Sequence, residues 1–228
     1  MIFAPFFFLY VALLFAALVL LFALIQVHLI AYALQHAGLT PGQAFTVLLL
    51  SLLGSYVNIP VWRSRAHEVE TVELVSYFGV RYRVPIHLRR EQTVIAVNFG
   101  GAVLPTLVSF YLMAREPAMV LPGLLAVAAV AFVANRFAKP LRGVGIAMPM
   151  FVAPLAAAGS ALVLHALIPG DYDTSAVAYV AGTMGTLIGA DLMNLDKVSK
   201  LGAPVASIGG AGTFDGIFLS GLIAALLA

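Results

Sequence analysis

The sequence predicts an all-α membrane protein with seven transmembrane helices and a small cytoplasmic β-hairpin between the second and third helices. The first observation is composition: of 228 residues, 62% are hydrophobic and only 10% are charged, whereas soluble domains carry about 25% charged residues. The second observation is a series of seven apolar runs, and the third is the way the basic residues are distributed between them.

The apolar runs give the positions of the expected helices. A helix that spans a bilayer needs about 20 apolar residues. The first run is longer than this, so we expect its helix to tilt or protrude, and it is too long for the apolar region of a signal peptide. Residues 1–228 are expected to form one polytopic membrane domain. Its helices are expected at about 4–32, 43–61, 92–114, 118–136, 145–168, 174–194 and 205–228.

The basic residues predict the orientation of these helices. If the seven spans alternate in direction, eleven of the twelve lysines and arginines fall on one side, and only Arg115 falls on the other. Because basic loops stay in the cytoplasm, the N-terminus is expected inside and the C-terminus outside, in a multi-pass protein of the plasma membrane. The eleven residues are Arg63, Arg65, Arg81, Arg83, Arg89, Arg90, Arg136, Lys139, Arg142, Lys197 and Lys200.

The segment between the second and third expected helices has a different pattern. Polar and apolar residues alternate from Glu70 to Tyr77 and from Val80 to Val84, with Phe78-Gly79 between the two stretches. A period of two is typical of a half-exposed strand. We therefore predict a β-hairpin over about 70–84. It either lies solvated on the bilayer surface or offers an edge to which a peptide can pair.

Small residues and prolines predict how the helices pack. Gly182, Gly185 and Gly189 recur on the sixth expected helix, which is typical of a face against which another helix packs closely. Pro105 and Pro154 lie within expected spans. A proline inside a helix kinks it and frees backbone carbonyls, so we interpret both as kinks for packing.

Composition also excludes several kinds of site. The chain has no cysteine, which excludes disulfides and thiolate metal ligands. Its formal net charge of +2 is too small to suggest a nucleic-acid partner. Ser51, Ser160 and Ser220 have no positioned base beside them, so a serine nucleophile is not expected. We expect neither a metal nor an organic cofactor.

Two aspartates lie inside apolar runs, and they are the best indication of function. Asp191 follows Gly189-Ala190 in the sixth expected helix, and Asp215 follows Gly212-Thr213-Phe214 in the seventh. A carboxylate in a membrane span costs about 2.5–3.5 kcal/mol on insertion scales and usually faces the protein interior. Two carboxylates held close together share one proton, which gives one acid and one base. The alternative is that both aspartates cap helix ends or bond to neighbouring amides.

Polar amides are expected at the same depth as the aspartates. The four asparagines fall toward the cytoplasmic ends of their helices, and Asn194 shares a helical face with Asp191. The glycine-rich segment 209–212 disfavours helix, so Asp215 is expected in the first turns of a helix that begins near Gly212. One polar layer would result, and Asn135 belongs to it. The residues expected to line the substrate site are Gly212, Gly216, Asn194, Asn98 and Asn58.

The residues around both aspartates resemble a known protease family. Asp191-Leu192, at the end of a helix that runs from outside to inside, is similar to the Tyr-Asp helix of the presenilin and signal-peptide-peptidase intramembrane aspartyl proteases. The segment 212–220 is similar to their Gly-x-Gly-Asp helix, with Phe214 in place of the second glycine and Ala190 in place of the tyrosine. The whole chain more closely resembles an uncharacterised prokaryotic family with seven spans.

The resemblance implies a catalytic role for the two carboxylates. Asp191 and Asp215 would form a dyad that hydrolyses peptide bonds of transmembrane or signal-peptide segments, so the expected partners are such a substrate and the lipid bilayer. A proton-coupled transporter or carrier also uses intramembrane carboxylates and broken helices, although no inverted repeat is visible. A non-catalytic membrane scaffold is the third interpretation. The sequence leaves the oligomeric state open.

Overall fold

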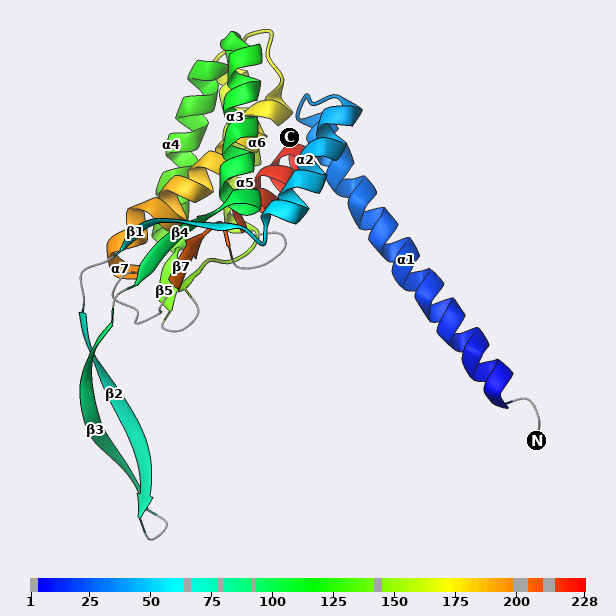
Figure 1. The fold of residues 1–228 in the computed structure, drawn as a ribbon. Helices are drawn as coiled ribbons and strands as arrows, with labels where there is room; N and C mark the ends of the chain where they lie inside the picture. The colour runs from blue at the N-terminus through cyan, green and yellow to red at the C-terminus, as the bar shows by residue number, and fades with distance from the viewer. Residues whose placement is uncertain are drawn as a thin grey trace.

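The computed structural model describes residues 4–63, 67–77, 80–91, 93–141, 145–198, 205–210 and 216–228. Most of these residues form apolar helices, and the β-strands gather at one end of the helical bundle (Figure 1). The α-helices are α1 (Ala4–His36), α2 (Pro41–Gly54), α3 (Leu104–Arg115), α4 (Val120–Phe137), α5 (Val152–Leu167), α6 (Thr174–Thr186), α7 (Leu195–Val198) and α8 (Gly216–Leu227). Four short helical turns join them: η1 (Phe99–Val103), η2 (Pro117–Met119), η3 (Leu187–Asp191) and η4 (Leu192–Asn194).

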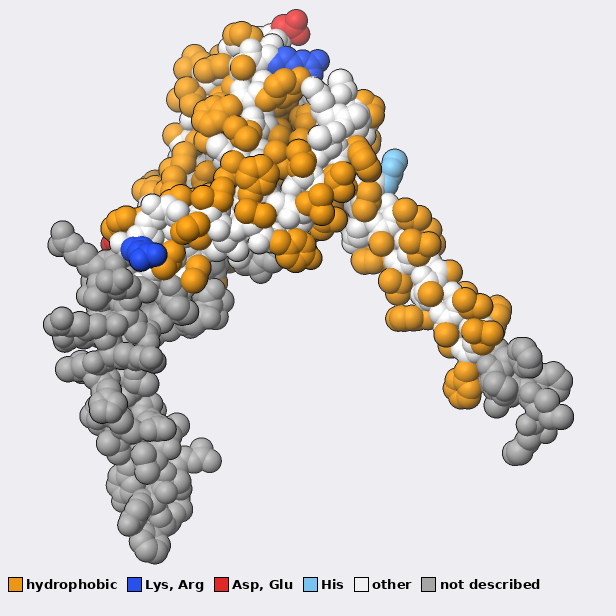
Figure 2. Space-filling view, viewed as in Figure 1, with side chains coloured by type: hydrophobic (Ala, Val, Ile, Leu, Met, Phe, Trp, Pro, Cys, Tyr) orange, Lys and Arg blue, Asp and Glu red, His pale blue; other side chains and the backbone are white. Residues whose placement is uncertain are grey.

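Length and composition of the helices indicate a membrane protein. Among the described residues, three helices are long and apolar enough to cross a membrane: Phe8–His36, Pro117–Phe137 and Thr174–Lys197. Four shorter apolar helices, Pro41–Gly54, Phe99–Arg115, Val152–Leu167 and Gly216–Leu227, fall in order within or beside the other expected spans. On the face shown in Figure 2, hydrophobic side chains cover the bundle, and the charged side chains drawn there gather at its two ends.

Helix α1 is attached to the bundle only near its C-terminal end. Ala33 and Leu34 are buried in the main core, and Ile30 packs against it. From Phe8 to Leu29 every side chain is exposed, and the helix leads away from the other helices (Figure 1). The apolar surface of α1 therefore faces the surroundings of the protein rather than its core.

Helix α6 lies at the centre of the bundle. Every residue from Ser175 to Thr183 is buried, and α6 packs against α3, α4, α5 and α8. A Cβ on Gly182 would stand 2.6 Å from the Ser220 carbonyl oxygen on α8, and one on Gly189 would stand 2.7 Å from Ala131 Cα on α4. The expected close-packing face is confirmed, and it serves two neighbouring helices.

A three-stranded sheet replaces the ends of three expected helices. Strands β1 (Asn58–Arg63), β4 (Val94–Asn98) and β7 (Val205–Ile208) pair in the order β1-β4-β7, with β4 antiparallel to β1 and parallel to β7. The expectations of helix over 58–61, 94–98 and 205–208 are therefore wrong. Valine and isoleucine favour strands, and Pro60 is tolerated because β1 is an edge strand whose register shifts beside it.

The start of the fifth expected helix is also strand. β5 (Lys139–Leu141) pairs with β6 (Gly145–Ala147) in a short antiparallel ladder, and helix begins only at Val152. Pro154 lies in the first turn of α5, where a proline loses no intrahelical hydrogen bond, so it starts the helix instead of kinking it. Pro105 lies inside the continuous helical segment Phe99–Arg115, directly after the π-turn η1, where the helix departs from regular α-helical geometry.

The expected hairpin is present and is longer than the alternating pattern indicated. β2 (His67–Tyr77) and β3 (Val80–Glu91) pair antiparallel from His67↔Glu91 to Tyr77↔Val80. The register shifts between Thr71 and Val72, opposite the segment that contains Pro85. This shift interrupts the alternation of polar and apolar residues from which the hairpin was predicted. The expected turn, Phe78-Gly79, lies outside the described residues.

Candidate functional site

Asp191 lies in the wall of a cavity of about 150 Å³. The cavity is formed where the C-terminal end of α6 meets the first turns of α8 and the segment between β6 and α5. Asp191 is half-buried, and Thr186 and Ser220 are the other polar side chains in the wall. The remaining lining residues are Ile146, Met148, Met150, Ala190, Gly216, Ile217 and Leu219.

A π-helical turn gives Asp191 its direction. α6 ends at Thr186, and η3 continues it as a π-helix to Asp191, after which Leu192 N–H donates to the carbonyl oxygens of both Ile188 and Leu187. A π-turn contains one residue more than an α-turn, which rotates the following side chains by about 100° relative to a regular helix. Such turns occur frequently at functional sites. The position of Asp191 in the cavity wall thus depends on the π-turn η3, which the periodicity of a regular helix does not predict.

The second expected catalytic residue cannot be placed, because Asp215 and Gly212 lie outside the described residues. Helix α8 begins at Gly216, the residue that follows Asp215 in the chain. Gly216 is one of the residues that line the Asp191 cavity. The structure therefore brings Asp191 and the immediate neighbour of Asp215 to the same cavity.

The preceding glycine-rich segment is not helical in its described part. Val205–Ile208 is strand β7, and Gly209 has a φ of 68°, a conformation that only glycine adopts without strain. Gly209 packs against the first turn after β4, where Gly101 leaves room for its carbonyl oxygen. The prediction that the segment 209–212 departs from regular helix is confirmed for Gly209 and Gly210, its described residues.

Asn98 and Asn58 form one hydrogen-bonded pair instead of joining a single polar layer. Asn98 Nδ2 donates to Asn58 Oδ1 over 3.1 Å and to the Ser55 carbonyl over 2.6 Å, and Asn98 Oδ1 accepts from Gly101 N–H over 2.8 Å. Asn58 Oδ1 also accepts from Ser207 Oγ on β7. The Asn98 amide therefore ties α2, the sheet and η1 together.

Asn194 and Asn135 form the second pair. Asn194 Nδ2 donates to Asn135 Oδ1 over 3.2 Å and to the Ala190 carbonyl over 2.9 Å, and Lys197 Nζ donates to Asn194 Oδ1 over 2.8 Å. Asn194 is fully buried, and its amide donates to the Gly189 and Ala190 carbonyls in the π-turn. The described wall of the Asp191 cavity contains Gly216 but none of the asparagines that were expected to line the site.

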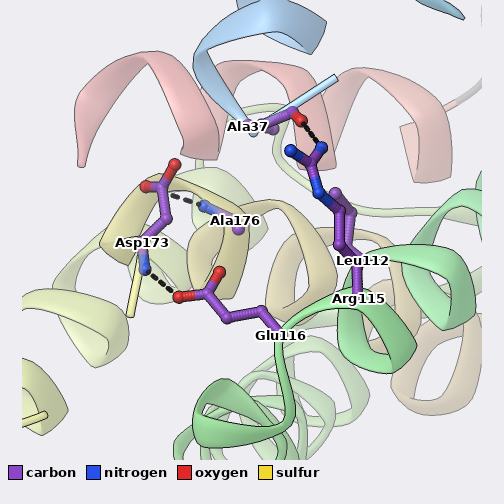
Figure 3. Close-up of a pocket in the computed structure, with 7 residues that line it drawn as sticks. Ala37, Leu112, Arg115, Glu116, Asp173 and Ala176 are labelled. Carbon is purple, nitrogen blue, oxygen red and sulfur yellow. Dashed lines mark hydrogen bonds between the residues drawn. The ribbon is translucent and has the colours of Figure 1, made fainter. Parts of the chain in front are cut away.

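A second cavity, here called the outer cavity, lies at the opposite end of α6, away from the three-stranded sheet. The sequence did not predict it. It has a volume of about 290 Å³ and is lined by the connections α1–α2, α3–α4 and α5–α6 (Figure 3). Arg115 Nη1 donates to the Gly38 carbonyl over 2.7 Å, and Asp173 N–H donates to Glu116 Oε1 over 3.0 Å. Asp173 Oδ1 in turn caps α6 by accepting from Ser175 N–H over 2.8 Å.

The residues of this outer cavity give Arg115 a local structural role. Its guanidinium holds the α1–α2 connection, while Glu116 and Asp173 hold the α5–α6 connection beside it. The signal in the sequence was an isolated charged pair, Arg115-Glu116, between two apolar runs. No group of three or more histidine or carboxylate side chains suited to a metal occurs in the part of the chain that was described.

Comparison with known proteins identifies the family. A family model with the description "protein of unknown function (DUF1614)" matches residues 52–227. The chain belongs to the DUF1614 family. The matched region of this DUF1614 protein contains the sheet, the hairpin and the Asp191 cavity, and it leaves out α1 and most of α2. No curated protein and no solved structure matches the chain.

Proposed function

We propose that this DUF1614 protein is an intramembrane aspartyl protease that cleaves transmembrane or signal-peptide segments. The observation that carries the proposal is that Asp191 and Gly216 line one cavity. Gly216 is covalently bonded to Asp215, so the chain segments that carry both carboxylates meet at this cavity. The resemblance of both segments to the presenilin-like proteases supports the same assignment.

The proposed chemistry needs only the two carboxylates and water. Two carboxylates in contact do not both ionise, so one is protonated near neutral pH. The ionised carboxylate removes a proton from a water molecule as its oxygen attacks the peptide carbonyl carbon. The protonated carboxyl gives its proton to the leaving nitrogen, and the C–N bond breaks. One proton is taken up and one released, so the dyad returns to its starting state.

The cavity wall suits a hydrophobic peptide. Ile146, Met148 and Leu219 contribute apolar surface around Asp191, and methionine adapts its shape to different side chains. A substrate of this kind is a transmembrane segment whose local helix has opened. The catalytic water is expected to enter from the end of the bundle that carries the sheet.

We also propose that all seven helices cross the membrane, with the N-terminus in the cytoplasm. Three helices have the required length. The α1–α2, α3–α4 and α5–α6 connections meet around the outer cavity, as alternating spans require. The Asp191 cavity then lies at the cytoplasmic end, on the side of the basic residues.

Cleavage by reconstituted protein tests the catalytic proposal. Purified protein in liposomes is incubated with a panel of fluorogenic transmembrane peptides, and Asp191→Asn, Asp215→Asn and the double variant are compared with wild type. Each single change is expected to lower the rate by about 10²-fold or more, with no further loss in the double variant, because residues that act as a unit are not additive. Asp171→Asn, at an exposed position in the α5–α6 connection, is the matched control and should cleave like wild type.

A second measurement does not depend on the choice of substrate. A peptide with a hydroxyethylene group in place of the scissile bond imitates the tetrahedral intermediate, and such analogues bind more tightly than substrates. It should bind wild type and lose affinity with Asp191→Asn. Wild-type protein that neither cleaves the panel nor binds the analogue contradicts the protease proposal and leaves the carrier interpretation of the aspartates.

A further inference from the structure

Three hydroxyl groups are buried on α6 without a hydrogen-bond partner in the described protein. They belong to Tyr179, Thr183 and Thr186, whose side chains are 0%, 0% and 3% exposed. The hydroxyls of Tyr179 and Thr183 lie close enough to interact, but they do not meet in full hydrogen-bonding geometry. Residues three and four apart share a helix face, so the three hydroxyls form one row along α6.

The two threonines of the row differ from three other hydroxyl residues in the helices. Thr46 Oγ1 donates to the Gly42 carbonyl over 2.8 Å, Ser109 Oγ to Pro105 over 2.9 Å and Ser160 Oγ to Ala156 over 2.6 Å. This bond to the carbonyl four residues earlier is the usual local solution for a helical hydroxyl. Thr183 and Thr186 do not form it, so their hydroxyl groups remain available to a partner that is not protein backbone.

The environment of Thr183 shows that α8 makes room for the row. A Cβ added to Gly221 on α8 would overlap Thr183 Oγ1, so the glycine leaves the hydroxyl in the interface between α6 and α8. A buried hydroxyl without a partner costs about 1–3 kcal/mol. Buried polar groups of this kind are commonly satisfied by internal water molecules with about three hydrogen bonds each.

The row lies on the part of the helix between the two cavities described above. Ala176, one helical turn before Tyr179, lines the outer cavity with Asp173 and Glu116, while Thr186 itself lines the Asp191 cavity. Thr183 and Thr186 are three residues apart, which corresponds to about 4.5 Å of helix rise. One water molecule with hydrogen bonds of about 2.8 Å on each side spans about this distance.

The stretch of helix from Asp173 to Asp191, which contains the row, is about as long as a membrane is thick. From Asp173 to Asp191 the helix rises about 27 Å at 1.5 Å per residue, and the hydrocarbon core of a bilayer is about 30 Å thick. Carboxylates therefore stand at both ends of this stretch of helix, and the three hydroxyls lie between them. Carboxylates are among the side chains that build proton relays in membrane proteins, so Asp173 and Asp191 are suited to exchange protons at its two ends.

We propose that this face of α6 holds a chain of internal water molecules that carries protons between the outer cavity and Asp191. A hydroxyl or a water accepts a proton on one side and releases another on the opposite side, so no bond in the protein is changed. Asp173 or Glu116 exchanges the proton at the outer end, and Asp191 exchanges it at the inner end. The path gives Asp191 access to protons from the side opposite the sheet.

Proton flux into liposomes tests the path. Full-length protein is reconstituted with a pH-sensitive dye inside, and flux is driven by a potassium gradient with valinomycin. Wild type should acidify the liposomes faster than protein-free liposomes do. Thr183→Val and Thr186→Val keep the side-chain shape but remove the hydroxyl, and each is expected to slow the flux about tenfold, which corresponds to about 1.4 kcal/mol at the barrier.

Two control variants separate loss of the hydroxyl from loss of folding. Thr46→Val removes an exposed helical hydroxyl on α2 and should conduct like wild type. Thr183→Ser restores a hydroxyl at the same position and should regain most of the flux. Wild-type flux equal to that of protein-free liposomes overturns the proposal, and so do valine variants that conduct as fast as wild type.

Thermal stability gives an independent readout. If the row is dry, valine at position 183 or 186 removes an unsatisfied group and raises the melting temperature. If the row holds water, the substitution removes hydrogen bonds and the melting temperature stays unchanged or falls. A rise for both valine variants contradicts the proposal. The proposal does not rest on peptide hydrolysis, because Thr183 belongs to the path and not to the dyad.

Discussion

Replacement of Gly189 by alanine tests the packing that positions Asp191. Gly189 lies in the π-turn η3 and presses on α4. An added Cβ would stand 2.7 Å from Ala131 Cα and would overlap the Ala131 carbonyl oxygen, whereas ordinary contacts of a Cβ are 3.4–4 Å. The two helices must therefore separate by more than half an ångström, since the obstructing atoms belong to the backbone.

The expected magnitude follows from this overlap. Overpacking in a close-packed core costs about 1–3 kcal/mol. The matched control is Gly159→Ala on α5, where a Cβ meets nothing within 4 Å. Alanine is favoured over glycine in a helix by about 1 kcal/mol, so the control should be slightly stabilised. Gly189 is helical too, so this gain applies to both variants, and their free energies of unfolding should differ by about 1–3 kcal/mol.

Thermal unfolding in detergent measures this difference through the fluorescence of Trp62, the one tryptophan of the chain. A change of 1 kcal/mol shifts the melting temperature by about 2–4 °C in proteins of this size. The melting temperature of Gly189→Ala should therefore lie about 2–12 °C below that of Gly159→Ala. Equal melting temperatures would refute the close approach of α6 and α4 at this glycine.

Two further predictions concern the amides and the topology. Asn98→Ala should lower the free energy of unfolding by about 1–3 kcal/mol, because Gly101 N–H and the Ser55 carbonyl lose their partner. The control Gln35→Ala, on the exposed side of α1, should have little effect in the same thermal assay. Single cysteines in place of Ser199 and Asp171 should react with a membrane-impermeant maleimide from opposite sides of the membrane, since the natural chain has no cysteine; labelling of both from one side would contradict seven alternating spans.

The helical part of the fold could be predicted because its signal is local. Apolar runs of sufficient length locate the helices, and the alternating residues locate the hairpin. The glycines of α6 identify a packing face without showing its partners, which turn out to be α4 and α8.

The strands of the three-stranded sheet could not be recognised by the same reasoning. A short apolar run has no periodicity that separates a strand from a buried helix, and β4 and β7 continue directly into apolar segments. The signals present were the β-branched residues of 94–97 and Pro60, whose ring is unsuited to a helix interior. The length of the apolar runs favoured helix and outweighed these signals.

The candidate site depended on tertiary contacts that the sequence does not encode locally. Asp191 was identified from its position in an apolar run, but its direction depends on the π-turn η3. The asparagines were expected at one depth, and the structure separates them into pairs between residues 40 and 59 positions apart. The outer cavity requires three connections to meet, and its residues are unremarkable when each connection is read alone.

The attachment of α1 by one end has a mechanical consequence. The 33 residues of this helix extend about 50 Å, which exceeds the hydrocarbon thickness of about 30 Å. A thinner bilayer therefore requires a steeper inclination of α1. Because the helix is held only near its C-terminal end, where Ala33 and Leu34 enter the core close to Gly38, we expect that inclination to act as torque on the rim of the outer cavity. A change in lipid chain length would then change the force that α1 exerts on the rim of the outer cavity.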